Sequence, residues 1–226
     1  RGIEKFSVIR SLSAIEQADV CLLLLDVNEL HVQLDQKIAG MIKDAGRGLI
    51  LVVSKWDSLP AENEQNEADA EALTKTPYTR DLLAPRIARD FDFVPWAPLV
   101  LTSSVTGQNV SKLFDIVLEI ANEREKRIKT PELNQWLRGV TDRTPPAGLK
   151  NRAPKLNYIT QENDNPTPAF KVFGSHTKFL HWSYKRHLER KLREVYGFNG
   201  TPVQLWFIEK HVTHKHGKSP TKEIRN

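Results

Sequence analysis

The sequence predicts an α/β fold, in which a partial parallel sheet with flanking helices is followed by a smaller α+β domain. Three short apolar runs, each followed by a helical pattern, predict the first part; they are residues 20–25, 49–53 and 99–101. Such runs are typical of strands buried on both faces, and their alternation with helices is typical of parallel βαβ units. The second part is predicted from an α-β-β-α-β order that begins near Arg127.

The helices of the first part are predicted from the spacing of apolar residues. An opening helix is indicated by apolar residues that recur every third position, namely Phe6, Ile9, Leu12 and Ile15. A helical pattern also follows each apolar run. We therefore expect helices over residues 34–45, 69–90 and 110–126.

The elements of the second part are bounded by turn and capping residues. Thr130 is placed to cap a helix that has Pro131 at its first position. Two strands follow at 155–160 and 169–173, then a long helix over 177–196 that Gly197 ends, and a last strand at 203–207. We expect three segments: an incomplete α/β domain over 1–126, a smaller α+β domain over 127–210, and a basic flexible tail over 211–226.

Composition excludes several classes of protein. The 226 residues are 39% hydrophobic and 27% charged, which is typical of globular domains and not of disordered or collagen-like chains. No apolar run approaches the roughly 20 residues that span a bilayer, and a single cysteine cannot form an intramolecular disulfide. We therefore expect a cytoplasmic protein without a membrane span.

The formal net charge of +5 conceals a division. Residues 1–126 carry 14 basic and 20 acidic side chains, a net charge of −6, whereas residues 127–226 carry 19 and 8, a net charge of +11. Such an asymmetry indicates two modules, one of which meets nucleic acid or simply presents a solvated basic surface.

Polar residues follow two of the apolar runs directly. Ser54, Lys55 and Asp57 come after the second run, and Ser103 and Ser104 come after the third. Ligands bind at the carboxyl ends of strands in α/β sheets. A carboxylate there can accept from two N–H donors of a guanine edge, while a lysine stem covers the ring. Either loop alone also fits an ordinary polar turn, but the two together favour a base-binding site.

These loops resemble the Asn-Lys-x-Asp and Ser-Ala-x elements of guanine-nucleotide-binding proteins. More specifically, the chain resembles the second GTPase domain and KH-like domain of the bacterial double-GTPase family Der (EngA), from residue 1 to about residue 208. The resemblance implies that residues 1–126 are the C-terminal part of a P-loop GTPase domain, without its phosphate-binding loop, and that residues 127–210 are a KH-like domain. The segments that carry this resemblance occur in the family's order; they are residues 4–10, 55–57, 106–108, 185–193 and 197–202.

The resemblance implies binding of GTP or GDP, hydrolysis of GTP, and Mg²⁺ in the complete protein. It also implies guanine contact by Ser54, Lys55, Asp57, Ser103 and Ser104. Two departures matter: Ser54 stands where the family has asparagine, which weakens guanine selectivity, and Ser104 stands where it has alanine, which costs little if the backbone N–H meets the base.

The largest departure is that no Gly-x-x-x-x-Gly-Lys-Ser/Thr sequence occurs in the chain. That loop supplies the N–H groups and the lysine that hold the nucleotide phosphates. We therefore expect no catalytic residue in this chain and no GTP hydrolysis by it alone. The first apolar run would also lose a strand neighbour, and such an edge favours aggregation. We thus expect that the chain starts inside a longer protein.

The predicted helix over 177–196 has an apolar arc and a basic arc. The apolar arc, expected to face the sheet, holds Leu180, Tyr184, Leu188, Leu192 and Val195. The basic arc presents RNA-facing candidates, which are Lys178, Trp182, Lys185, Arg186 and Arg193. Cations around an aromatic ring suit contacts with phosphates and bases. A solvated helix face, or a surface docked on the acidic first domain, remains an alternative.

Two weaker signals are read as structural. Gly197-Phe198-Asn199-Gly200 matches the letters of the KH clamp, but it lies between a helix and a strand and is predicted to be a turn. His211, His214 and His216 fit a polar tail better than a metal site.

The leading hypothesis is a monomeric GTP-binding and GTP-hydrolysing ribosome biogenesis factor. It would act on the large ribosomal subunit or its rRNA, with GTP controlling how GTPase domains pack on the RNA-facing KH-like domain. The alternative is a nucleotide-free RNA- or protein-binding module, in which the GTPase remnant serves as a scaffold.

Overall fold

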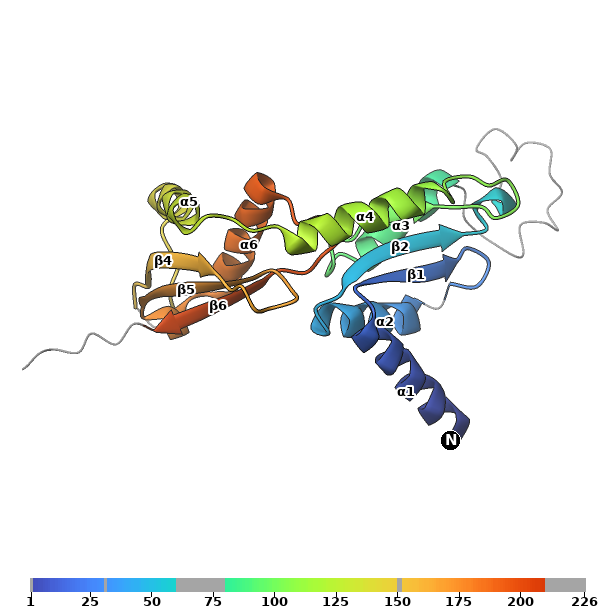
Figure 1. The fold of residues 1–226 in the computed structure, drawn as a ribbon, viewed down its shortest axis with the longest axis horizontal. Helices are drawn as coiled ribbons and strands as arrows, with labels where there is room; N and C mark the ends of the chain where they lie inside the picture. The colour runs from blue at the N-terminus through green and yellow to red at the C-terminus, as the bar shows by residue number, and fades with distance from the viewer. Residues whose placement is uncertain (1, 31, 60–79, 150–151, 210–226) are drawn as a thin grey trace, which may run out of the picture.

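The structure is a computed structural model that describes residues 2–30, 32–59, 80–149 and 152–209. Two three-stranded sheets lie toward opposite ends of this part of the chain, with the orders β1-β2-β3 and β4-β5-β6 (Figure 1). The predicted fold class, a parallel α/β sheet followed by a smaller α+β domain, is confirmed.

The first sheet is parallel and contains β1 (Val20–Asp26), β2 (Gly48–Ser54) and β3 (Leu99–Leu101). Residues 48–53 of the central strand are all buried, as an uninterrupted apolar run predicts. The outer strand differs, because Leu22 and Leu24 are exposed. The prediction of burial on both faces is therefore wrong for β1.

Helices cover the two faces of this sheet unequally. On one face, α2 (Val32–Asp44) and α3 (Arg80–Asp90) pack against β1 and β2 through a large apolar cluster. On the other face, α4 (Lys112–Glu125) packs against β2, β3 and Val20 at the start of β1 through Ile120, and it leaves Leu22 and Leu24 of β1 exposed. The predicted start of α3 at residue 69 lies outside the described residues.

The opening helix, α1 (Gly2–Gln17), projects away from the first sheet (Figure 1). Ile15 is buried in the apolar cluster beneath α2, whereas Leu12 is exposed. The predicted helix is confirmed, but its apolar spacing does not produce a continuous buried face over residues 10–17.

The second sheet has β4 (Lys155–Gln161) antiparallel to β5 (Ala169–Ser175), and β5 parallel to β6 (Gln204–Glu209). Two helices cover one face of this sheet, namely α5 (Thr130–Arg143) and α6 (Trp182–Tyr196). The apolar cluster between them contains Phe170, Val172 and Leu188. The predicted α-β-β-α-β order is confirmed.

Three details of this domain differ from the predictions. Lys129, not Thr130, is the residue before α5 begins. The predicted helix over 177–196 is divided into a 3₁₀ turn, η4 (Thr177–Phe179), and α6, which begins only at Trp182. Val195 is 62% exposed and does not belong to the buried arc.

His181 explains the division of that helix. Its ring nitrogen Nδ1 accepts a hydrogen bond from the backbone N–H of Ser183 at 3.2 Å, as an N-cap side chain does. Gly197 ends α6 with a φ of 83°, a conformation that favours glycine, so the predicted helix stop is confirmed.

The two domains meet at a junction between the end of α4 and the turn from α6 to β6. Gly200 donates to the carbonyl of Trp96 at 2.7 Å, and Leu49 donates to the carbonyl of Gly200 at 2.8 Å. Backbone hydrogen bonds thus join the turn of the second domain to the start of β2 and to the segment before β3.

None of the helices in the described residues is long and apolar enough to span a membrane.

Candidate functional site

The loops that follow β1, β2 and β3 lie at one edge of the first sheet. Because the strands are parallel and in register, Asp26 at the end of β1 is paired with Ser54 at the end of β2. Ser103 follows β3, the next strand of the sheet. The structure therefore brings the two predicted base-binding loops to the edge where ligands of α/β sheets bind.

Thr102 ties the second loop to the third. Its backbone N–H donates to the carbonyl of Val53 at 2.7 Å, and its carbonyl accepts from the N–H of Trp56 at 3.0 Å. Its hydroxyl donates to the same Val53 carbonyl at 3.1 Å. Trp56 itself is buried, so the short 3₁₀ turn η1 (Trp56–Ser58) that carries Asp57 is anchored on both sides.

Lys55 is held in an uncommon conformation by the loop after β2. Its φ is 58° and its ψ is 34°, in the left-handed region that non-glycine residues seldom adopt. Its Nζ lies 2.6 Å from Oδ2 of Asp26, with 58% of the lysine side chain exposed. The hydroxyl of Ser58 donates to the Lys55 carbonyl at 2.7 Å and stabilises the turn.

The pairing with Lys55 keeps Asp26 ionised. Partial burial alone would raise the pKa of Asp26, but the hydrogen bond from Lys55 and the backbone N–H of Asn28 together lower it below its usual value. The same contact raises the pKa of Lys55. At neutral pH both groups are charged, and the carboxylate fixes the direction of the lysine side chain along the sheet edge.

Asp57 has a buried carboxylate oxygen to which no described residue donates a hydrogen bond. Its Oδ1 has almost no solvent-accessible surface and has no hydrogen-bond partner within residues 2–30, 32–59, 80–149 and 152–209. Burial of an acceptor without a donor destabilises the folded state by on the order of 1–3 kcal/mol. A bound ligand could supply the donor, and this makes Asp57 a candidate for ligand contact.

The loop after β3 is shaped by its own polar residues. The hydroxyl of Ser103, which is fully buried, accepts from the N–H of Thr106 at 3.1 Å. Asn109, with a φ of 56°, donates its side-chain amide to the carbonyl of Leu101 at 2.8 Å. Ser104 is exposed between them, with its side chain on the surface.

Ser54 is the last residue of β2, directly before the loop that carries Lys55 and Asp57, and it is paired with Asp26 at the end of β1. Its hydroxyl donates to the carbonyl of Leu25 at 3.3 Å, across the pair of strands. The Ser54 hydroxyl therefore joins the ends of β1 and β2.

The predicted RNA-facing residues are divided between two surfaces. Lys178 lies in η4 over the ring of Phe179, at 5.2 Å from its centroid. Arg186 lies over the ring of Trp182, at 5.5 Å, and 61% of this tryptophan is exposed. Lys185 is also exposed on α6.

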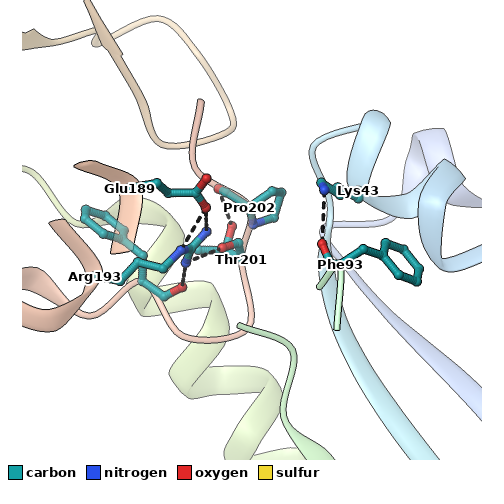
Figure 2. Close-up of polar contacts among 7 residues, drawn as sticks. Lys43, Phe93, Glu189, Arg193, Thr201 and Pro202 are labelled. Carbon is teal, nitrogen blue, oxygen red and sulfur yellow. Dashed lines mark hydrogen bonds and ion pairs between the residues drawn. The ribbon is translucent and has the colours of Figure 1, made fainter. Parts of the chain in front are cut away.

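Arg193 faces the other way, into the domain junction. It forms an ion pair with Glu189 at 3.0 Å and donates to the carbonyls of Phe198 and Thr201 at 2.7 and 3.0 Å (Figure 2). Its guanidinium lies 5.6 Å from the centroid of the Trp96 ring. With 14% of its side chain exposed, Arg193 is a structural residue of the junction, and we remove it from the RNA-facing candidates.

Comparison with known proteins identifies the second domain. Residues 127–207 match the family model described as the KH-domain-like region of EngA bacterial GTPase enzymes, C-terminal. This span contains all the elements from α5 to β6 except the last two residues of that strand.

Curated relatives extend the similarity over both domains. GTPase Der of Chloroflexus aggregans is 45% identical over 208 residues, which is 92% of this chain and 43% of the relative. GTPase Der of Thermomicrobium roseum is 40% identical over 211 residues, 93% of this chain and 43% of the relative. The chain is similar to the C-terminal part of GTPase Der. It spans less than half the length of these Der proteins.

The similarity to Der bears on the loops as well as on the KH-like domain, because the aligned region includes nearly the whole chain. Guanine contact by Ser54, Lys55, Asp57, Ser103 and Ser104 remains a prediction. Among the described residues no cluster of three or more His, Cys, Asp or Glu side chains is arranged to hold a metal ion. His211, His214 and His216 lie outside the described residues.

Sequence reasoning missed Asp26 and Thr102. Asp26 ends the first apolar run, and the rule that singled out the other two loops applies equally to the carboxyl end of this strand. Thr102 was passed over because its role is to join two loops through backbone and hydroxyl bonds, and no sequence spacing signals such a contact.

Proposed function

We propose that this chain supplies the guanine-recognition loops and the RNA-facing domain of a cytoplasmic, monomeric GTP-binding and GTP-hydrolysing factor for assembly of the large ribosomal subunit. The observation that carries the proposal is the buried Oδ1 of Asp57, to which no residue in the described part of the chain donates a hydrogen bond, at the carboxyl edge of a parallel sheet. Similarity to GTPase Der over both domains supports it independently.

The chemistry of the loops fits a guanine base. A carboxylate is an acceptor only, and guanine presents two adjacent N–H donors, at N1 and the 2-amino group, that one carboxylate can satisfy together. Asp57 would supply that carboxylate and gain the partner that its Oδ1 lacks. The aliphatic stem of Lys55 would cover one face of the ring, and the loop at Ser103 and Ser104 would offer the backbone N–H of Ser104 to the base oxygen, since that of Ser103 donates to the carbonyl of Gln108 at 3.2 Å.

Phosphate binding and hydrolysis require groups that the loops described above do not provide. The 226 residues contain no glycine-rich phosphate loop, and Mg²⁺ in such sites is held partly by the phosphates themselves. We therefore propose that this chain contributes base recognition, and that GTP hydrolysis depends on a phosphate-binding segment joined to it.

The remaining steps of the proposal concern RNA. The exposed Trp182 with Arg186 stacked on it, and the exposed Lys185 beside them, form a cationic and aromatic patch that suits rRNA. GTP would control how GTPase domains pack on the KH-like domain and hence whether this patch is accessible.

The test is a chimera in which the N-terminal part of the Chloroflexus aggregans GTPase Der is joined to this chain at the matching position. We expect the chimera to hydrolyse GTP and to prefer guanine over xanthine nucleotides. Asp57→Asn should reverse that preference by about a hundredfold or more, since the new amide donates to the xanthine 2-oxo group where the carboxylate accepted. The measurement is kcat/KM for GTP and for XTP.

Asp115→Asn is the matched control, because Asp115 is an exposed carboxylate in the first turn of α4 and belongs to neither base-binding loop. It should leave both kcat/KM values unchanged. An Asp57→Asn chimera that still prefers GTP as strongly as its parent would refute base recognition by this site.

The second candidate is a nucleotide-free RNA- or protein-binding module, and the hydroxyl of Ser54 favours it, because it is already used to join β1 and β2. Titration of GDP into the chimera decides between the two. Binding supports the first candidate, and its absence in a folded chimera supports the second.

A further inference from the structure

The sheet of the KH-like domain has one face that no described helix covers. Side chains alternate between faces along a strand, and those that point toward α5 and α6 include Leu156, Ile159, Phe170 and Val172. Their neighbours in sequence therefore point the other way. We call the surface that they form the open face; its members are Lys155, Tyr158, Lys171, Phe173, Trp206 and Ile208.

A β-bulge shapes the outer strand of the open face. The register between β4 and β5 shifts between Leu156 and Tyr158, so Asn157 and Tyr158 are both exposed in succession. A bulge of this kind redirects a side chain and is common near functional surfaces. Here it leaves 42% of Tyr158 accessible on a strand whose next residue, Ile159, is completely buried.

Aromatic rings cross the open face from one edge strand to the other. Tyr158 of β4 is paired in register with Phe173 of β5, and the ring centroids lie 5.9 Å apart. Trp206 of β6 is 38% exposed and is paired in register with Lys171 of β5. The Nζ of Lys171 lies 5.9 Å from the centroid of the Trp206 ring. Because β4 and β6 are two strand spacings apart and Trp206 lies two residues along β6 from the position level with Tyr158, the two residues are separated by roughly 12 Å.

Positive charge surrounds these rings. Lys155 is exposed at the start of β4, and Lys171 lies in the middle of the face. Residues 127–209 carry 14 basic and 7 acidic side chains, a net charge of +7. The acidic group at this face is Glu162, which forms an ion pair with Lys171. Aromatic surface with excess positive charge fits an anionic, ring-bearing ligand better than a neutral apolar one.

A pocket adjoins the open face at the edge of β4. It has a volume of about 390 Å³ and lies between α5 and β4, with Tyr158 in its wall. The lining also includes Asn134, Arg138 and Asn157. Arg138 is exposed, and its Nε donates to the carbonyl of Asn134 at 3.2 Å, whereas its terminal guanidinium nitrogens form no hydrogen bond or ion pair in the described part of the chain. The pocket thus lies between Tyr158 of the open face and the cationic side chain of Arg138.

We propose that the open face and its adjoining pocket bind single-stranded RNA, with unpaired bases stacked on Tyr158 and Trp206 and phosphates near Lys155, Lys171 and Arg138. Aromatic side chains on a sheet stack with any unpaired base, whereas the bases of a duplex are not accessible to them. The inference rests on the RNA-binding part of the proposed function, and it assigns that role to a surface other than the patch on α6.

The experiment measures binding of fluorescently labelled ten-nucleotide oligouridine and oligoadenosine to the full chain, by fluorescence anisotropy at about 50 mM salt. Tyr158→Ala and Trp206→Ala should each weaken binding by about tenfold, as expected for loss of one stacked base. The double variant should weaken it by about a hundredfold. A duplex of the same length should bind at least about tenfold more weakly than the single strands.

Two kinds of control separate stacking from folding. Tyr158→Phe and Trp206→Phe keep a ring at each position and should retain most of the affinity, and thermal unfolding should show all variants to be folded. Phe114→Ala removes an exposed aromatic ring from α4 of the first domain and should change the affinity less than about twofold if the open face is the site.

Three results would overturn the proposal. The first is that the double alanine variant binds the single strands as tightly as the parent. The second is that the folded parent chain binds no single-stranded RNA. The third is that the parent chain self-associates and the double variant does not. Loss of binding with Trp182→Ala alone would move the RNA site to α6; the proposed function would then stand and this inference would fail. Failure of the chimera to use GTP would instead refute the proposed function without changing the anisotropy result.

Discussion

Arg124 of α4 donates a hydrogen bond to the hydroxyl of Thr201 at 3.1 Å, across the boundary between the two domains. Both residues are buried, with 6% and 0% of their surfaces exposed. The same guanidinium donates to the carbonyls of Gly46 and Pro166, at 2.9 and 3.1 Å, and it has no carboxylate within ion-pair distance in the described residues. A charged group buried among neutral acceptors therefore joins segments of both domains.

The consequence concerns domain movement. Burial lowers the pKa of Arg124, yet a guanidinium stays protonated at any pH a protein tolerates, so the charge must keep its acceptors. Thr167 adds a further bond to the Gly46 carbonyl at 2.9 Å. Any nucleotide-controlled separation of these two domains would have to expose or re-pair all of these groups together.

Arg124→Met should uncouple the domains. We expect the free energy of unfolding to fall by about 2–4 kcal/mol, because two buried acceptors and the carbonyl of the exposed Pro166 lose a charged donor, and we expect unfolding to change from one transition to two. Differential scanning calorimetry measures both effects.

Arg127→Met is the matched control for that variant. Arg127 is exposed and its bonds to the carbonyls of Lys126 and Asn163 are 3.3 Å long, so the change should stay within about 0.5 kcal/mol. A single transition of unchanged temperature in Arg124→Met would show that the guanidinium does not hold the domains together.

Gly200→Ala should damage the same junction by a different route. Gly200 has a φ of 68°, and a Cβ there would lie 2.2 Å from Cγ1 of Ile120 in α4. Strain and overpacking together should destabilise the protein by about 2–4 kcal/mol, as measured by urea unfolding.

Gly139→Ala provides the comparison, since Gly139 lies inside α5 with no atom within 4 Å of the added Cβ. It should be stabilising by about 0.5–1 kcal/mol. Equal effects of the two variants would contradict the packing described for Gly200.

Local pattern predicts the strands and helices of this protein well, and it fails where another domain intervenes. The uninterrupted run of β2 is buried on both faces because helices cover both sides of it. Arg193 lies on the basic arc of its helix, as the periodicity predicts, but Trp96 of the first domain covers that position. Helix periodicity describes one helix and contains no information on what packs against its polar side.

The candidate base site shows the same division. The rule that loops meet at the carboxyl edge of a parallel sheet correctly places Ser54, Lys55 and Ser103 together. The ion pair between Lys55 and Asp26 was not predictable, because it depends on a left-handed backbone conformation at a lysine that local sequence does not favour. The break before α6 was likewise hidden, since Leu180 keeps the apolar spacing of the helix while His181 caps a new one.

Ser54→Asn should strengthen guanine binding in the chimera with the GTPase Der segment. An amide at this position is long enough to reach the base, whereas the serine hydroxyl is used to bond the carbonyl of Leu25. One added hydrogen bond should lower the Kd for GDP by about five- to tenfold, measured by isothermal titration calorimetry. Ser104→Ala should leave the Kd within about twofold, because only the backbone N–H of that residue is expected to meet the base. A weaker Kd in Ser54→Asn would show that the serine is adapted to this site.

Tyr184→Phe tests the buried phenol that joins α6 to the end of α5. The hydroxyl donates to the carbonyl of Thr144 at 2.7 Å, and burial raises the pKa of Tyr184 to about 12. In the unfolded chain a tyrosine ionises near pH 10. The folded state therefore favours the neutral phenol, and this contribution to stability is fully present below about pH 10 and is lost as the pH rises toward 12.

The expected result follows from that sign. At pH 7, Tyr184→Phe should be less stable than the parent by about 1 kcal/mol, the net value of one hydrogen bond. Above about pH 10 the parent should lose stability more steeply than the variant, so that the difference in the free energy of unfolding narrows. Urea unfolding at a series of pH values from 7 to 11 measures this difference, which would stay constant if the phenol ionised equally in both states.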